Sequence, residues 1–231
     1  MFLHRIHLNP RSRTVRRDIA DPYQMHASLC RAFLPPDQPC PPGAVLWRLE
    51  PETNAAGQPR VLVQSRLAPD WSQVAAPDWL AAETDAGIDL TQKLSLDTLE
   101  PGKRFRFRLR ANPCVTRNGK RLGLMQPDEQ KNWLEGQGVR HGFALPEPTT
   151  LDYFEFHKST GRGHGDFRIT HEQMLTGRQH SGNRIRIYSV LYEGRLTVTD
   201  PARFKEALAA GIGHGKVMGL GLLSVVPIFM E

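Results

Sequence analysis

Hydrophobic and polar residues alternate in several short segments, which is the pattern of strands with one buried face. Strand-like segments in the first hundred residues are Phe2–Leu8, Val45–Leu49, Arg60–Leu67 and Lys93–Leu99. Those in the rest of the chain are Arg104–Arg110, Leu151–His157, Ile185–Val198 and Leu222–Ile228. The pattern therefore predicts a protein with many short strands.

Helices are predicted where apolar residues recur at helical spacing. Asp21 and Pro22 form a typical helix start, because an aspartate can cap the first turn and proline suits the first helical position. This helix continues through Met25 and Leu29 and is expected to end near Leu34, before two prolines. The other predicted helices are Pro127–Gly136, Pro201–Ala210 and a weaker one over Asp70–Gly87.

The order of these elements predicts the fold class. The first half reads β-α-β-β-α-β, and the second half repeats this order more loosely, which is typical of tandem ferredoxin-like (RRM-like) domains of the α+β class. We place the boundary within residues 90–102 and assign residues 1–92 to the first domain and 93–231 to the second. Within the second domain, Gly161–Gly182 is expected to be a mobile excursion between strands.

Composition narrows the class of protein. A hydrophobic content of 39% in 231 residues is enough for a globular core. The longest apolar run, Val217–Met230, is interrupted by glycine and proline and is shorter than the ~20 residues of a membrane-spanning helix. Cys30, Cys40 and Cys114 show no CxxC spacing, so we expect neither a disulfide framework nor a metal site. We predict a cytoplasmic protein without a membrane segment.

The positive charge is concentrated in one stretch. The net charge is +6, and residues 103–121 contain eight basic residues and no acid. From Arg104 to Arg110 arginine alternates with an apolar residue, so a strand would carry the arginines on one face and Phe105, Phe107 and Leu109 on the other. A rigid basic face of this kind favours an anionic partner, of which nucleic acid is the commonest.

Tyr23 and His26 are the candidate catalytic pair. They are neighbours at i, i+3 in the first turns of the predicted helix and lie beside its apolar stripe. One reading is a pair that only packs at the helix edge. The other is an acid–base pair, since a histidine can transfer protons near neutral pH and a tyrosine hydroxyl can orient a nucleophile. RNA suits such a pair because its 2′-hydroxyl is an internal nucleophile, which removes the need for a metal-activated water.

A glycine-rich segment near the C-terminus is a candidate contact for an anionic chain. The segment Gly211–Gly221 contains five glycines, including both of its end residues. The segment is not a Walker loop, because Val217 stands where Ser or Thr should bind magnesium. The glycines instead allow backbone amides to approach an anion, with Lys216 adding charge, and His214 is a further candidate contact. A packing loop is the alternative reading.

The spacing of the other histidines does not indicate a metal site. His164, His171 and His180 match no familiar metal motif. His4 and His7 are expected to face opposite sides of a strand and to be structural.

Several motifs together resemble one family. They are Asp21-Pro-Tyr-Gln-Met-His26, Leu46-Trp-Arg-Leu-Glu50, Arg106-Phe-Arg-Leu-Arg-Ala-Asn-Pro113, Gly119-Lys-Arg121 and Gly211–Ser224. In these motifs the chain resembles the CRISPR repeat-processing endoribonucleases of type I-E systems, the CasE subunits of Cascade.

The resemblance implies an activity and partners. Members of this family have tandem ferredoxin-like domains and cut the repeat at the base of its RNA hairpin without a metal or other cofactor. The 2′-hydroxyl attacks the phosphate and leaves a 2′,3′-cyclic phosphate, and the enzyme then retains the guide RNA and assembles with the other Cascade subunits. By match of the helix motif, Tyr23 and His26 correspond to the catalytic pair. A non-catalytic RNA-hairpin-binding subunit is the alternative, and a ferredoxin-like enzyme acting on a small molecule is a third.

The resemblance also suggests how RNA is held. The family inserts a basic hairpin of the second domain into the RNA groove, and Lys158 is the counterpart that we assign to a basic residue near the scissile phosphate. The expected RNA-binding residues are Arg104, Arg106, Arg108, Arg110, Arg117, Lys120, Arg121, Lys158, Gly213, His214 and Lys216.

Overall fold

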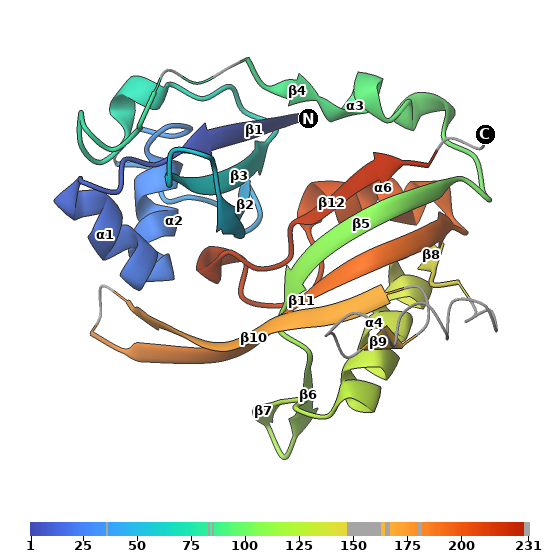
Figure 1. Cartoon of the computed structure of the whole chain (residues 1–231). Coiled ribbons are helices and arrows are strands. Elements are labelled where there is room, and N and C mark those ends of the chain that lie inside the picture. Colours follow the sequence, from blue (N-terminus) through green and yellow to red (C-terminus); the bar gives the residue numbers. More distant parts are fainter. Residues whose placement is uncertain are drawn as a thin grey trace.

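Two antiparallel sheets, one from each half of the chain, form the framework of the computed structural model (Figure 1). The structure describes residues 1–35, 37–82, 84, 86–146, 163–164, 167–179 and 182–228. Both sheets have the strand order of a ferredoxin-like domain, with the first strand between the third and the fourth. The predicted fold class is therefore confirmed.

The first sheet has the order β2-β3-β1-β4. Its strands are β1 (Phe2–His7), β2 (Val45–Thr53), β3 (Pro59–Ser65) and β4 (Ile88–Asp89). The helices α1 (Arg13–Ala20) and α2 (Pro22–Cys30) follow β1. Met25 and Leu29 of α2 are fully buried against Ile6, Val61 and Val63 of the sheet, so the apolar stripe of α2 lies on the core as predicted.

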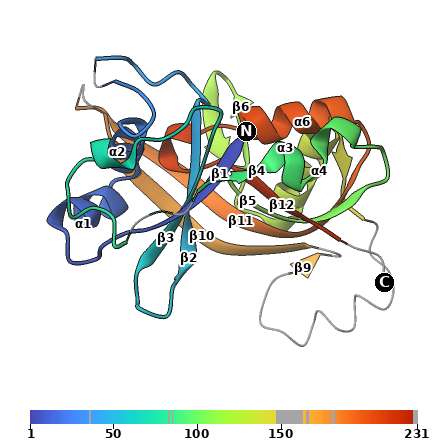
Figure 2. The same cartoon turned by 90° about the horizontal axis from the view of Figure 1, so that it is seen from above.

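The second sheet has the order β12-β5-β11-β10-β9, and β8 pairs with β11 at the side. Its strands are β5 (Arg104–Ala111), β8 (Phe143–Ala144), β9 (Gly163–His164), β10 (Phe167–Arg178), β11 (Arg184–Val198) and β12 (Leu223–Pro227). The helices α4 (Pro127–His141) and α6 (Pro201–Ala210) cover one face, where Phe105 stacks on Phe204 (Figure 2). The separate hairpin β6–β7 (Cys114–Arg117 and Lys120–Gly123) follows β5.

The first domain departs from the prediction in three places. Helix α1 was not predicted, because only Val15 and Asp18 of its eight residues are buried and the apolar signal is weak. The helix predicted over Asp70–Gly87 is wrong: among its described residues only the 3-10 turn Trp71–Gln73 is helical, and Pro77 interrupts the segment. Lys93–Leu99 is not a strand either.

The segment between the two sheets is helical. The short helix α3 (Leu90–Lys93) and the turn Leu96–Thr98 occupy it, and the Asp89 side chain caps α3 by accepting a hydrogen bond from the Thr91 amide. Leu90 and Leu94 pack into the core of the second sheet. The domain boundary between residues 92 and 93 remains a prediction, and this packing favours a boundary a few residues earlier.

The second domain has one long strand that was not predicted. Residues 167–178, expected to belong to a mobile excursion, form β10 and pair with β11 over almost their whole length. The alternation was hidden because the strand is largely exposed and carries a β-bulge between Thr170 and Gln173. The strand expected at Leu151–His157 lies outside the described residues.

Buried polar contacts join the two domains. Arg48 of β2 is 1% exposed, forms an ion pair with Glu50, and donates hydrogen bonds to the carbonyls of Arg108 and Leu222. Glu50 also pairs with Arg108 of β5. Since an unpaired buried charge is costly, this network fixes the relative position of the two sheets. Among the helices in the described ranges, none has the length and apolarity needed to cross a membrane.

Candidate RNA-processing site

The first turn of α2 is held from both domains. The Asp21 carboxylate accepts a hydrogen bond from the Tyr23 amide at 3.0 Å, which is the predicted cap, and Pro22 begins the helix. The same carboxylate accepts one from the Arg178 amide of β10 at 3.2 Å. Because one side chain caps the helix and contacts β10, the candidate pair on α2 has a defined position relative to the second domain.

Tyr23 and His26 line one open cavity of about 730 Å³ beside α2. Both side chains are partly exposed. Cationic Arg17 and Arg31 are in the same lining, and Val217 reaches it from the glycine-rich segment. The structure thus brings the candidate pair and that segment to one hollow that is open to a large ligand and bordered by positive charge.

Two cysteines lie beside His26, although their spacing gave no reason to expect a shared site. The Sγ atom of Cys30 is 3.5 Å from His26 Nε2, and Cys40 approaches from the following loop. A hydrogen bond with Cys30 and, to a smaller extent, the neighbouring His26 together lower the pKa of the Cys40 thiol to about 5, against the opposing effect of burial. The pKa of Cys30 is raised, mainly by the same contact. The i, i+4 spacing of His26 and Cys30 is the signal that could have revealed half of this cluster.

The glycine-rich segment uses backbone conformations that favour glycine. Gly211, Gly213, Gly215, Gly219 and Gly221 all have a positive φ. At Gly219 a Cβ atom would lie 2.8 Å from the Trp47 ring, so this position also needs glycine for close packing between the domains. The alternative reading as a packing loop is therefore right for part of the segment.

The polar residues of the segment lie near the β6–β7 hairpin. Lys216 Nζ donates a hydrogen bond to the Gly213 carbonyl at 2.7 Å, and burial lowers its pKa. The pKa of His214 is lowered first by burial and then by the positive charges of Arg121 and Lys216. Because the charge of Arg121 lowers the pKa of His214, the hairpin and the glycine-rich segment lie close enough for their charges to interact.

The β6–β7 hairpin presents three of the predicted RNA-binding residues to solvent. Arg117, Lys120 and Arg121 are all exposed, and the two-residue turn between its strands has positive φ at Asn118 and Gly119. The hairpin projects from the end of β5, away from the first domain (Figure 1). Its length and isolation suit insertion into a groove.

The arginines of β5 fall into two groups. Phe105, Phe107 and Leu109 are buried as predicted, and Arg104 and Arg106 are exposed on the opposite face. Arg108, however, pairs with three acids from elsewhere in the chain, namely Glu50, Glu52 and Glu193. Arg110 is only 6% exposed. The expected uncompensated basic face is therefore wrong at Arg108, whose charge is paired with acids of β2 and β11, and Arg110 is withdrawn from that face by burial.

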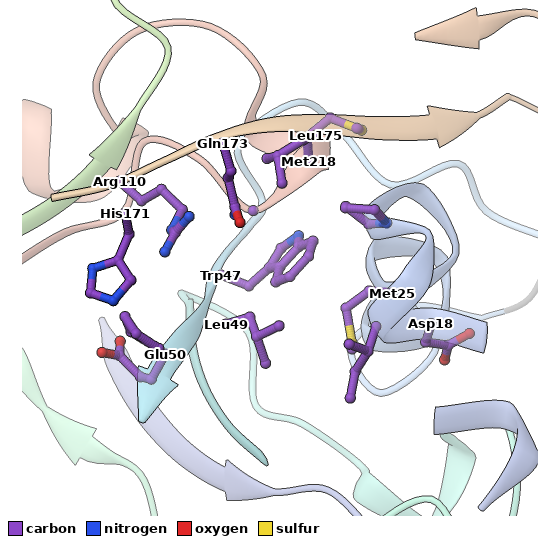
Figure 3. Close-up of a pocket in the computed structure, with 14 residues that line it drawn as sticks. Asp18, Met25, Trp47, Leu49, Glu50, Arg110, His171, Gln173, Leu175 and Met218 are labelled. Atoms are coloured by element: carbon purple, nitrogen blue, oxygen red, sulfur yellow. The ribbon is translucent and has the colours of Figure 1, made fainter. Parts of the chain in front are cut away.

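Arg110 points into a pocket of about 410 Å³ between the domains (Figure 3). Arg110 and His171 lie on one side of the pocket, Met25 on the other, and Trp47 between them. Within the described part of the chain, the Nε and Nη1 atoms of Arg110 have no hydrogen-bond partner. His171 enters the pocket from the β10 bulge with φ 49, a placement that its sequence spacing did not reveal. Lys158 lies outside the described residues.

These features define a class of protein, in which two ferredoxin-like domains carry a polar cavity beside one helix and a separate basic hairpin. A model of the family described as "CRISPR associated protein" matches residues 1–227. The chain belongs to this family.

Known relatives cover nearly the whole chain. It is 37% identical to the CRISPR-associated endoribonuclease Cse3 of Thermus thermophilus, over 98% of this chain and 100% of that one. It is 29% identical to the Cascade subunit CasE of Escherichia coli, over 90% of this chain and 93% of the relative. The resemblance expected from the motifs is thereby confirmed.

Solved structures agree with the fold. The structure of the endoribonuclease Cse3 bound to a 19-nucleotide RNA matches with a TM-score of 0.78 and 36% identity, over 98% of this chain and all of the other. A Thermus thermophilus Cse3 bound to an RNA representing a pre-cleavage complex matches with a TM-score of 0.75 and 35% identity, over 98% of each chain.

Proposed function

We propose that this protein is an endoribonuclease that cuts CRISPR precursor RNA at the base of the repeat hairpin. The observation that carries the proposal is the cavity on α2, where Tyr23 and His26 lie beside two arginines and the glycine-rich segment. The full-length similarity to a named CRISPR-associated endoribonuclease supports the substrate class.

In the proposed reaction His26 moves the proton and Tyr23 assists. The ribose 2′-hydroxyl attacks the adjacent phosphorus, and the bond from phosphorus to the 5′-oxygen of the next nucleotide breaks. The products are a 2′,3′-cyclic phosphate and a free 5′-hydroxyl. His26 acts as general acid or base, and the Tyr23 hydroxyl orients the nucleophile or stabilises developing charge. The positive charges of Arg17 and Arg31 would attract the phosphate into the cavity.

This reaction does not need a metal ion, because the attacking oxygen belongs to the substrate. Among the described residues, one group of three His, Cys, Asp or Glu side chains is close enough to share an ion, and it consists of His26, Cys30 and Cys40. Its thiols do not suit magnesium, which prefers oxygen ligands. The donor set therefore favours acid–base chemistry over two-metal hydrolysis.

RNA binding is assigned to elements of the second domain. The β6–β7 hairpin, with Arg117, Lys120 and Arg121, would enter the RNA groove, and Gly213, His214 and Lys216 would contact the backbone. Arg104 and Arg106, which are exposed on β5, would provide further contacts. Arg108 and Arg110 take a structural part in the proposal, since both are held at the domain interface. The role of Lys158 near the scissile phosphate remains a proposal from the family resemblance.

After cleavage the protein would keep its product and join other Cascade subunits in the cytoplasm. The relative from Escherichia coli is named a Cascade subunit, which supports this assembly role. The alternative, a subunit that only binds the hairpin, shares every feature except the chemistry of His26.

The test is cleavage of repeat RNA by the purified protein in EDTA, with analysis of the product ends. We expect cleavage at one site, a cyclic phosphate on the upstream product, and no cleavage of RNA with a single 2′-deoxyribose at that site. Intact RNA at saturating protein would contradict the enzyme and favour the binding subunit. A linear 3′-phosphate or a 3′-hydroxyl formed at the moment of cleavage would contradict the mechanism.

A further inference from the structure

The side chains of His26, Cys30 and Cys40 meet at one edge of the cavity. Each contributes one possible metal-ligand atom, and these atoms all lie within 4.8 Å of one another. We propose that the three side chains form a binding site for a thiophilic metal ion, with Zn²⁺ as the probe, and that bound metal switches cleavage off. The switch rests on the proposed function, whereas the binding of metal does not.

The geometry fits tetrahedral zinc. Zinc binds histidine nitrogen at about 2.0–2.1 Å and cysteine sulfur at about 2.3 Å, so two such ligands at a tetrahedral angle lie roughly 3.5 Å apart. The distance between His26 Nε2 and Cys30 Sγ is 3.5 Å. The i, i+4 spacing on α2 aligns these two ligands on one helix face, and Cys40 supplies the third from the loop after the helix.

The choice of donors selects the class of metal. Two thiols and an imidazole favour Zn²⁺ or Cu⁺, whereas Mg²⁺ and Ca²⁺ prefer oxygen ligands. Two thiolates balance the charge of Zn²⁺, so binding is compatible with Arg17 and Arg31 in the same lining. The cavity is open, so a water molecule or an RNA phosphate oxygen could supply the fourth ligand.

Metal binding would affect the proposed acid–base step through one atom, Nε2 of His26. When Nε2 of His26 coordinates zinc, its lone pair is no longer available to accept a proton. The proposed acid–base step therefore stops while metal is bound, although the basic hairpin is untouched and hairpin RNA still binds. A metal that blocks the reaction is compatible with a reaction that requires none.

The first experiment measures binding without reference to activity. The full chain is reduced, treated with a chelator and titrated with Co²⁺, whose thiolate complexes absorb characteristically, and Zn²⁺ is then added in competition. We expect one tight site with a thiolate-to-cobalt charge-transfer band that zinc abolishes. Cys40→Ser should weaken Co²⁺ binding by more than about 100-fold, since even the loss of an outer-sphere partner costs about 10- to 100-fold.

The matched control is Cys114→Ser, which removes the third cysteine of the chain, in β6 and outside this cluster, and should bind Co²⁺ as the unmodified protein does. Circular dichroism of both variants shows that they fold. Absence of a thiolate band in the reduced protein would overturn the inference, as would an unchanged band and affinity in folded Cys40→Ser.

The second experiment measures the switch. Zn²⁺ added at a concentration that fills the site should inhibit RNA cleavage by the unmodified protein and by Cys114→Ser, each relative to its own rate without metal, and EDTA should restore that rate. The cleavage rate of Cys40→Ser should change little when Zn²⁺ is added, relative to the rate of the same variant without metal, and Mg²⁺ should not inhibit the unmodified protein. Equal inhibition of Cys40→Ser would overturn the switch. If no variant cleaves RNA but Co²⁺ still binds through thiolates, the proposed function fails while the metal site stands.

Discussion

Helix α2 and the β6–β7 hairpin carry the two halves of the proposed activity and hold their polar residues in opposite ways. His26 is half-buried, with Cys30 3.5 Å away and a neighbouring helix cap tied to β10. Arg117, Lys120 and Arg121 are exposed on a projecting hairpin. Proton transfer needs side chains in a fixed geometry. Electrostatic attraction to phosphates acts over about a Debye length and therefore tolerates movement of the basic side chains. Changes on α2 should therefore alter rate, and changes on the hairpin should alter affinity.

The largest expected effect is that of His26→Ala on cleavage. We expect the single-turnover rate to fall about 10²- to 10⁴-fold, as for removal of an acid–base group, because the proton carrier is lost. Affinity for the repeat hairpin, measured by filter binding, should stay the same. A parallel loss of affinity would break the division between the two regions.

Tyr23→Phe tests the second member of the proposed catalytic pair. It keeps the ring and removes only the hydroxyl, so the rate should fall by a smaller factor than in His26→Ala. An unchanged rate would remove Tyr23 from the proposed pair and leave His26 alone.

The largest expected effect on stability is that of Glu50→Gln, because the Glu50 carboxylate pairs with both Arg48 and Arg108 and its side chain is 4% exposed. Loss of the charge leaves the guanidinium of Arg48 buried without its ion pair, which should lower the free energy of unfolding by about 3–5 kcal/mol. Urea denaturation of the variant and of the unmodified protein measures this difference in the free energy of unfolding. Rate and affinity should then fall together, since both regions depend on how the domains dock.

Glu52→Gln is the matched control. Glu52 also pairs with Arg108, but its side chain is 55% exposed, so the expected loss is about 0–1 kcal/mol. Equal destabilisation by the two variants would contradict the assignment of Glu50 as the buried link.

A smaller effect is expected for charge reversal on the hairpin. Arg117→Glu with Arg121→Glu should weaken binding and reduce the salt dependence of the binding constant by about 1 in slope per lost phosphate contact. The cleavage rate at saturating RNA should stay within a few-fold. Lys93→Glu with Lys205→Glu makes the same change in net charge on α3 and α6, and an equal loss of affinity there would show that only overall charge matters.

The smallest expected effect is a dependence of stability on pH that arises from His4, which lies in neither α2 nor the β6–β7 hairpin. His4 is buried, and burial lowers its pKa below the ordinary value of 6.5. The unfolded chain therefore takes up a proton at His4 more readily than the folded one, so stability is full above about pH 6.5 and declines as pH falls below it. Denaturation midpoints at pH 7.5 and 5.5 measure this decline. In His4→Gln the decline should be shallower, and an unchanged decline would exclude His4 as a cause.

Local patterns predicted much of the fold. The alternation in β5 correctly placed three apolar side chains in the core, and the Asp-Pro starts correctly located α2 and α6. Helix α1 and strand β10 were missed because both are largely exposed, so that few apolar residues mark either element in the sequence.

The site was predictable only as far as it is local in sequence. Tyr23 and His26 share a helix face, so their proximity followed from helical spacing. The pairing of Arg108 with Glu50 and Glu193 joins residues 58 and 85 positions apart, and no local pattern contains it. The approach of Cys40 to His26 depends on the path of a proline-containing loop, which spacing alone does not define.

The most direct test is a structure of the protein with a repeat hairpin that carries a 2′-deoxyribose at the cleavage site. The account predicts that the scissile phosphate lies in the cavity on α2, with one of its oxygens within about 2.6–3.2 Å of a nitrogen of His26. It also predicts that the β6–β7 hairpin enters the RNA groove. A scissile phosphate bound elsewhere, with His26 facing solvent, would contradict it.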